Sequence, residues 1–331
     1  IVGAGAIGGY MAVRIANAGH NVSVIARGPH LAAIKARGMK LIEENDEFVA
    51  ENLTATEFVG ELGPMDVVLL ALKAHQIVPI VNDMPVLLGP NTVIVTLQNG
   101  IPWWYFQNFA GDYANQVVET VDPGGLLFNS IDPNRLIGCI AYPATTISKP
   151  VVIQHIEGNR FPVGELSGMK TERVQMVSDL FAESGFKSRI LDDIRSEIWL
   201  KLWGNLTFNP ISALTHSTLV DICQFPLTRQ LAAEMMTEAQ TVGERLGAHF
   251  RIPMEKRIAG AESVGKHKTS MLQDVEAGKP IEIESMLGAV IELAEVTGVQ
   301  TPTLRAIYAC VSLLDKTLSQ EKIIIKGISK E

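Results

Sequence analysis

Hydrophobic residues in the first half of the chain gather in short runs rich in β-branched side chains. These runs lie at 21–25, 65–72 and 92–97, with longer mixed stretches between them. Such alternation predicts strands joined by helices, the arrangement that builds a parallel sheet through right-handed crossovers. Two further runs, at 151–157 and 160–164, are typical of a closing pair of strands. The pattern therefore predicts an α/β fold for this half.

After Gly164 the apolar residues are spaced three and four positions apart, which is typical of amphipathic helices. The predicted helices are 171–184, 194–209, 227–246 and 285–296. Ser167 and Gly168 form a short connection, so we expect the boundary near residues 166–169. The predicted domains are an α/β domain over 1–166 and an all-α domain over 167–331.

Length, charge and cysteine content narrow the class of protein. A chain of 331 residues favours two domains. With 28 Lys and Arg against 36 Asp and Glu, the net charge of −8 argues against a nucleic-acid partner.

The three cysteines lack metal-ligand spacing, so we expect a reducing cytoplasm and no metal site. The longest apolar run, 65–72, is too short to cross a bilayer, so we expect a soluble protein without membrane contact. Because the chain opens on Ile1 within a predicted strand, we expect an initiator and a residue or two before it, and this apolar start is not evidence for a signal peptide.

The sequence Gly-Ala-Gly-Ala-Ile-Gly at positions 3–8 has the spacing of a dinucleotide-binding turn. In this role Gly3 permits the tight turn, Gly5 lets the backbone approach a pyrophosphate, and Gly8 lets helix and strand pack closely. Ala6 and Ile7 open the following helix, whose free N–H groups would face the phosphates. The alternative is a turn of small residues that serves packing alone.

Arg27 follows the second predicted strand, where an acidic residue would bind the adenosine ribose of NAD. An arginine there favours the 2′-phosphate of NADP instead. We therefore expect NADP (NADPH) as the cofactor, and the alternative is a solvated surface arginine.

Two more polar groups follow predicted strands, at the sheet edge where α/β proteins bind ligands. Lys73 comes after the strand at 67–72 and can reach a phosphate or ribose. Asn99 comes after the strand at 93–97 and can bind the nicotinamide-side ribose or the substrate. Either residue could instead only shape a turn, Asn99 above all because Gly100 follows it.

Polar residues recur every four positions at Lys201, Asn205 and Asn209 in an otherwise apolar helix, so they share one face. Buried polar groups need partners, and a bound substrate would supply them. The alternative is a lysine that extends to water beside two amides that cap neighbouring helices. We expect Pro210 to kink or end this helix.

Two side chains further along the chain have a local explanation. Ser270 and Gln273 have the spacing of a capping box at a helix start. Glu282 is expected in the first turn of another helix, where the helix dipole favours a carboxylate.

The combination of these motifs resembles the ketopantoate reductase family. It consists of the glycine turn, Arg27, Lys73, the segment 98–100, the helix with its lysine and asparagines, and the segment 270–274 followed by Glu282. The resemblance covers nearly the whole chain. It implies a Rossmann domain joined to an all-α domain like the C-terminal domain of 6-phosphogluconate dehydrogenase. It also implies NADPH-dependent reduction of 2-dehydropantoate (ketopantoate) to pantoate in pantothenate biosynthesis, by hydride transfer to the 2-keto carbon.

The resemblance also implies a role for each residue. It makes Lys201 the general acid, places Glu282 in the catalytic site near the cofactor, and assigns Asn205, Asn209 and Ser270 to the substrate. Arg27 and Lys73 would hold the 2′-phosphate, and Asn99 would lie at the nicotinamide end, near both cofactor and substrate.

Two features depart from the family pattern and leave the substrate open. His267 stands where the family commonly has asparagine. The segment from Pro102 to Arg135, with its Trp-Trp-Tyr-Phe run, is longer than expected, and we favour burial of these aromatic residues in a homodimer contact over a lid. The expected partner is a small 2-keto acid. The alternatives are an NADP-dependent reductase of a different 2-keto or 3-hydroxy acid, or a non-catalytic NADPH-binding sensor.

Overall fold

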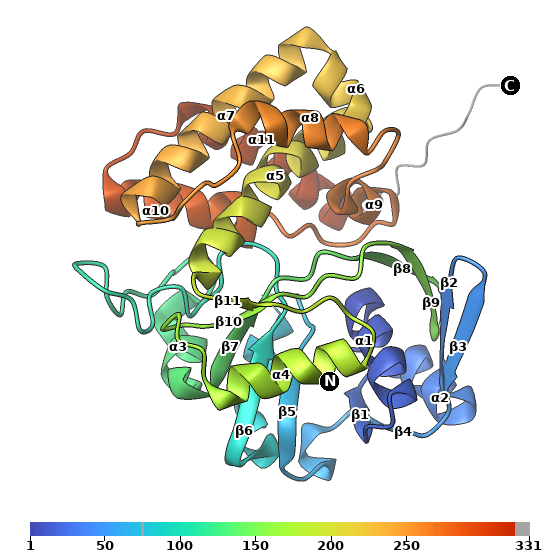
Figure 1. Ribbon diagram of the computed structural model, residues 1–331. Helices are drawn as coiled ribbons and strands as arrows, with labels where there is room; N and C mark the ends of the chain where they lie inside the picture. The colour runs from blue at the N-terminus through green and yellow to red at the C-terminus, as the bar shows by residue number, and fades with distance from the viewer. Residues whose placement is uncertain (74–75, 322–331) are drawn as a thin grey trace, which may run out of the picture. The chain divides into compact units, whose positions relative to one another are not determined.

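The computed structural model describes residues 1–73 and 76–321, which form two compact units (Figure 1). The first unit consists of residues 1–98, 103–117 and 124–194, and the second unit consists of 99–102, 118–123 and 195 onwards. The chain therefore passes between the units several times.

The first unit is an α/β structure. Its strands are β1 (Val22–Ile25), β2 (Met39–Glu43), β3 (Asp46–Ala50), β4 (Leu53–Thr56), β5 (Met65–Leu70), β6 (Leu88–Thr96), β7 (Leu136–Cys139), β8 (Ala144–Lys149), β9 (Val152–Glu157), β10 (Val163–Glu165) and β11 (Ile190–Leu191). Its helices are α1 (Ala6–Asn17), α2 (Gly28–Arg37), α3 (Leu126–Ser130) and α4 (Glu172–Glu183).

The main sheet contains the strands that the hydrophobic runs predict. Val2 bridges Ile25 of β1 and Leu70 of β5 in parallel, so the strand order is β4, β1, Val2, β5, β6, β7, β10 and β11. Neighbouring strands from β4 to β7 run parallel, whereas β10 is antiparallel to β7. The carboxyl ends of the parallel strands consequently meet at one edge of the sheet.

A second sheet, with the order β3, β2, β9 and β8, corrects one prediction. The runs at 151–157 and 160–164 do not pair with each other, because β9 pairs with β2 and β8 while β10 pairs with β7 and β11. Helix α1 packs on this second sheet at Gly9, where a Cβ would lie 2.7 Å from Ile153 Cδ1 and 2.8 Å from Met39 Cε. Gly9 therefore lets helix and sheet approach closely.

The second unit is helical. Its helices are α5 (Ile194–Thr215), whose first residue belongs to the first unit, α6 (Leu219–Gln224), α7 (Pro226–Arg245), α8 (Met254–Ser263), α9 (Ser270–Glu276), α10 (Ala289–Thr297), which follows a π-helical turn at Glu284–Gly288, and α11 (Pro302–Glu321). Each predicted helix is present, but α5 continues beyond Pro210 to Thr215, so the proline does not end it. The buried indoles of Trp199 and Trp203 hold α5 in the unit, and Trp203 Nε1 donates to Met236 O on α7 at 2.8 Å.

Residues 167–194 lie in the first unit, beyond the expected boundary at 166/167. Pairing explains this, because β11 joins β10 in the main sheet and α4 packs against β10. The apolar spacing of α4 marks it as a helix but carries no information on the surface it covers.

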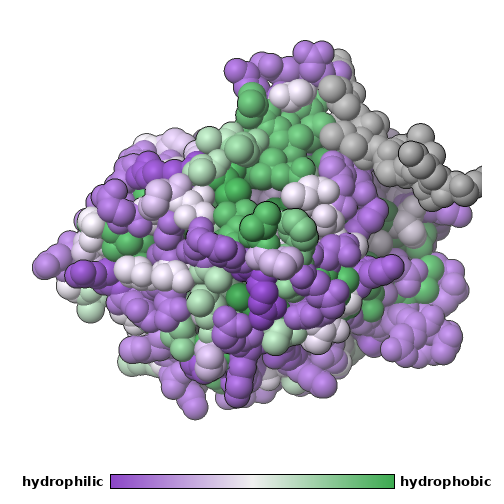
Figure 2. All heavy atoms as spheres, turned by 90° about the horizontal axis from the view of Figure 1, so that it is seen from above, coloured by the Kyte–Doolittle hydropathy of each residue, from purple (hydrophilic) through white to green (hydrophobic). Residues whose placement is uncertain are grey.

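The Trp-Trp-Tyr-Phe run of the 102–135 segment is buried within the chain, which corrects the expectation that it lies in a dimer contact. Trp103, Trp104, Tyr105 and Phe106 are each at most 1% exposed. Trp104 Nε1 also donates to Thr96 Oγ1 on β6 at 3.0 Å. These side chains are core, so they are not available to a partner or as a lid. Apolar atoms do gather in a patch on the face shown in Figure 2, and a homodimer stays a prediction.

Candidate functional site

The glycine turn joins the strand residue Val2 to α1 at the carboxyl edge of the main sheet. At each of its three glycines, the lack of a side chain has a different structural explanation. Gly3 has φ +102°, and a Cβ there would lie 2.7 Å from Leu72 Cδ2. A Cβ on Gly8 would lie 2.0 Å from Gly3 O, so any side chain would push helix and turn apart. A Cβ on Gly5 would meet no atom within 4 Å.

The space above Gly5 therefore has no packing explanation within the protein. Gly5 is the N-cap of α1, and its helix start has no side-chain cap, so the first N–H groups, including those of Ala6 and Ile7, remain available to a ligand. A phosphate group fits the charge and the donors of such a site.

Arg27 is exposed and is the N-cap of α2, two residues beyond the end of β1. Ala26 N donates to Thr56 O of the neighbouring strand at 3.0 Å, which fixes the course of the chain into Arg27. The Arg27 side chain therefore leaves the backbone at the same sheet edge as the glycine turn.

Lys73 lies three residues beyond β5 at this edge, and its backbone N donates to Gln76 Oε1 at 3.1 Å. The next residues, Ala74 and His75, lie outside the described part of the chain. Gln98, beyond β6, donates through Nε2 to Leu70 O at 2.7 Å and Leu72 O at 3.2 Å, so its amide positions the backbone that leads to Lys73.

In the second unit, Lys201 Nζ donates to Asn99 Oδ1 at 2.5 Å, although the two residues are 102 positions apart in the sequence. The segment that carries Asn99 is held by Ile101 N, which donates to Ser285 O at 2.8 Å. Gly100 has φ +85°, and a Cβ there would lie 2.1 Å from Ser285 O. Asn99 is therefore part of a turn and also a partner of the lysine, so its two proposed roles are compatible.

Asn205 and Asn209 follow Lys201 on α5 at one-turn intervals, and helical geometry places the three side chains on one face. Asn209 is only 6% exposed, whereas Lys201 and Asn205 are half-buried. The predicted polar face is thus partly covered, with an ammonium at one end.

The region around Ser270 differs from its prediction. The N-cap of α9 is Thr269, whose Oγ1 accepts from Leu272 N at 3.3 Å, and Gln273 Nε2 donates to Lys268 O at 3.1 Å. Ser270 is the first helical residue and is exposed, so the capping box at Ser270 is wrong. The cap does not use the Ser270 hydroxyl.

Glu282 is also placed differently from its prediction. The helical turn begins at Glu284, so Glu282 precedes it and is not in a first turn. Its side chain is half-buried. A favourable interaction with the helix dipole therefore does not account for its position.

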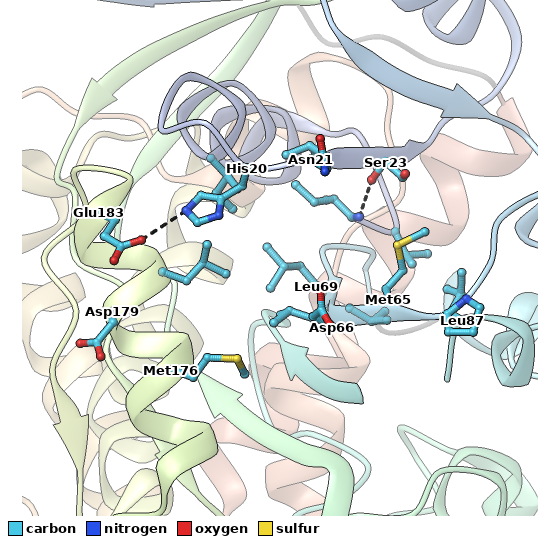
Figure 3. A pocket seen from close by; sticks show the side chains of 18 of the residues that line it. His20, Asn21, Ser23, Met65, Asp66, Leu69, Leu87, Met176, Asp179 and Glu183 are labelled. Carbon is cyan, nitrogen blue, oxygen red and sulfur yellow. Dashed lines mark hydrogen bonds and ion pairs between the residues drawn. The ribbon is translucent and has the colours of Figure 1, made fainter. Parts of the chain in front are cut away.

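A large cavity of about 1040 Å³ lies at the opposite end of the main sheet (Figure 3). Its walls include Asn21, Met65 and Asp66, which stand at the amino ends of β1 and β5, together with the first residue, Ile1. His20 Nε2 and Glu183 Oε2 lie 3.3 Å apart at its rim. Because open α/β sheets bind their ligands at the carboxyl ends, this cavity is not the candidate site.

Within residues 1–73 and 76–321, no cluster of three or more His, Cys, Asp and Glu side chains is arranged to hold a metal ion. Over the same residues, no helix combines the length and apolar character that crossing a membrane requires.

Comparisons with known proteins agree with the class that this fold and these side chains indicate, an oxidoreductase that acts on a keto group. The chain belongs to the ketopantoate reductase family. The sequence-family model of ketopantoate reductase PanE/ApbA matches residues 1–168, and the sequence-family model of its C-terminal domain matches residues 193–315. The resemblance and the fold class expected from the sequence are thereby confirmed.

Three relatives illustrate the range of the similarity. The chain is 49% identical to a 2-dehydropantoate 2-reductase of Mesorhizobium japonicum over 315 residues, which cover 95% of this chain and 96% of the relative. A crystal structure from Ralstonia solanacearum, described as a candidate ketopantoate reductase, matches with a TM-score of 0.91 and 34% identity, over 96% of this chain and 97% of that one. D-mandelate dehydrogenase with NADH and anilino(oxo)acetate matches with a TM-score of 0.82 over 96% and 98%, but its 20% identity shows the fold alone.

Proposed function

We propose that this protein reduces 2-dehydropantoate to pantoate with NADPH. The observation that carries the proposal is the hydrogen bond from Lys201 Nζ to Asn99 Oδ1, at the end of a helix face that also bears Asn205 and Asn209. A half-buried ammonium held by a neutral amide keeps its protons available, which suits a general acid.

Lys201 supplies the proton in this reaction. NADPH, when bound, supplies the hydride that adds to the 2-keto carbon. The carbonyl oxygen then gains negative charge, and an ammonium one hydrogen bond away stabilises that charge as it develops. Transfer of one Lys201 proton to the oxygen completes the alcohol and leaves the neutral amine, which regains a proton from solvent.

Two amides and a hydroxyl position the substrate. Asn205 and Asn209 can donate to and accept from the keto acid without competing for the proton. Ser270, whose hydroxyl the helix cap does not use, binds the substrate carboxylate in this proposal. Glu282 lines the site near the cofactor, with a catalytic role.

The first unit holds the cofactor in this proposal. Its pyrophosphate would lie over Gly5, where no atom fills the space, and the N–H groups of Ala6 and Ile7 would face it. Arg27 and Lys73 would hold the 2′-phosphate, and Asn99 would serve the nicotinamide end. The family fold also occurs in D-mandelate dehydrogenase described with NADH, so cofactor preference needs a direct test.

The test is NADPH oxidation with ketopantoate and a panel of branched and aromatic 2-keto acids, repeated with NADH. We expect the highest kcat/KM with ketopantoate and NADPH. A clear preference for another 2-keto acid would establish the alternative reductase. NADPH binding without turnover of any keto acid would favour a sensor, against which the lysine and amide face argues.

A further inference from the structure

Phe58 is an aromatic side chain left open to solvent at the ligand-binding edge of the main sheet. It lies two residues beyond the end of β4 and is 64% exposed, although phenylalanine is usually buried. Strand β4 is hydrogen-bonded to β1, the strand that leads into Arg27. Phe58 and Arg27 therefore leave neighbouring strands at the same end.

The backbone fixes how close these two residues are. Ile25 pairs with Thr56, and Ala26 N donates to Thr56 O at 3.0 Å. Adjacent strands are about 4.8 Å apart. Side chains that start two residues beyond the paired ends can therefore contact the same small molecule.

Local hydrogen bonds, and not packing of the ring, hold the Phe58 backbone. Thr56, which is 4% exposed, accepts from Phe58 N through Oγ1 at 3.1 Å and donates the hydroxyl proton to Glu61 Oε2. Phe58 O accepts from Glu61 N at 3.2 Å. The loop is thus fixed on its protein side while it leaves an aromatic ring exposed.

We propose that the ring of Phe58 stacks on the adenine base of the cofactor while Arg27 binds the 2′-phosphate of the same adenosine. This rests on the proposed function, because it requires a dinucleotide over the glycine turn. An aromatic side chain stacks favourably on a base, because every base offers a π face. A guanidinium and a phosphate form charge-assisted hydrogen bonds. The two side chains therefore recognise the two chemical parts of one adenosine 2′-phosphate.

The experiment compares Phe58→Ala and Phe58→Trp with the unmutated protein in two assays. One assay measures the Kd for NADPH by fluorescence. The other measures keto-acid reduction driven by reduced nicotinamide mononucleotide, which lacks the adenosine. Phe225→Ala is the matched control, because Phe225 is 56% exposed but lies in the second unit.

We expect Phe58→Ala to weaken NADPH binding about tenfold, within the cost of losing one base-aromatic stack, and Phe58→Trp to retain affinity. Turnover with the mononucleotide and the melting temperature should not change, and Phe225→Ala should bind NADPH normally. Unchanged NADPH affinity in Phe58→Ala would overturn the stacking while leaving the reductase proposal intact. An equal loss with the mononucleotide would overturn it as well, because the effect would then be structural. An unmutated protein that fails to bind NADPH would refute the proposed function and this inference together.

Discussion

Lys201→Ala tests the proposed mechanism most directly. A general acid typically contributes 10²- to 10⁴-fold to the rate, which is about 2.7 to 5.4 kcal/mol of barrier. We expect kcat to fall by that factor while the Kd for NADPH stays within about twofold, because the glycine turn and Arg27 belong to the other unit. The assays are steady-state kinetics, NADPH fluorescence titration and a melting curve. Lys256→Ala is the control, since Lys256 is an exposed lysine on α8 of the same unit.

The hydrogen bond to Asn99 adds a second, sharper measurement. A hydrogen bond to a charged group is worth about 1.5 to 3 kcal/mol, and the low end applies because Lys201 is half-buried and water can replace the amide. Asn99→Ala should therefore lower kcat about tenfold. If Asn99 acts through Lys201, the double variant should be no slower than Lys201→Ala alone.

Two outcomes would refute this reasoning. A folded Lys201→Ala protein that binds NADPH and turns over its best keto acid at a near-normal rate would remove the lysine from the mechanism. A double variant whose loss equals the product of the two single losses would show that Asn99 does not act through the lysine. A structural lysine would instead lower the melting temperature, with activity reduced only in proportion to the folded fraction.

Three further predictions test the cofactor side and the thiols. Arg27→Ala should reduce the preference for NADPH over NADH about tenfold, measured as the ratio of kcat/KM values, and an unmutated protein equally efficient with both cofactors would contradict this role. Gly8→Ala should lower the melting temperature by several degrees and weaken NADPH binding, because the new Cβ would lie 2.0 Å from Gly3 O. Burial raises the pKa of the Cys223 thiol to about 11. At pH 8 a thiol reagent should therefore modify the exposed Cys310 quickly and the buried Cys223 only after denaturation. Rapid reaction of both thiols in the folded protein would contradict this prediction. Because the Cys223 thiol of the unfolded chain ionises at lower pH than that of the folded protein, the free energy of unfolding should fall as the pH rises from about 9 toward 11.

The local parts of the site can be predicted from the sequence, because they depend on residues close together in the chain. The glycine turn needs only its own backbone geometry and the helix that follows. The face shared by Lys201, Asn205 and Asn209 follows from helical periodicity alone. The hydrogen bond between Lys201 and Asn99 cannot be predicted this way, because Asn99 lies 102 residues earlier and only tertiary packing brings it to the lysine.

The predictions that differ from the structure depend on contacts that a local pattern does not contain. Strand runs reveal that a strand exists but not which strand it pairs with, so β9 and β10 were expected together although they belong to different sheets. Adjacent hydroxyl side chains offer equivalent helix caps, and the sequence does not distinguish Thr269 from Ser270. Pro210 was expected to kink or end α5; it does not end the helix, because packing of α5 through its tryptophans outweighs the one lost hydrogen bond, and a kink stays a prediction.

The segment 118–123 has a consequence for how this protein is made. Its backbone at Glu119 and Thr120 donates to the Glu292 carboxylate on α10, at 2.8 and 2.7 Å. Thr120 and Glu292 are 172 residues apart, and ribosomes add about 5 to 20 residues per second, so roughly 9 to 34 seconds separate their synthesis. The strands from β7 to β11 are synthesised during that interval, while these two N–H groups still lack their acceptor. The segment 118–123 can therefore take up its final hydrogen bonds only after α10 has been synthesised, long after the segment itself.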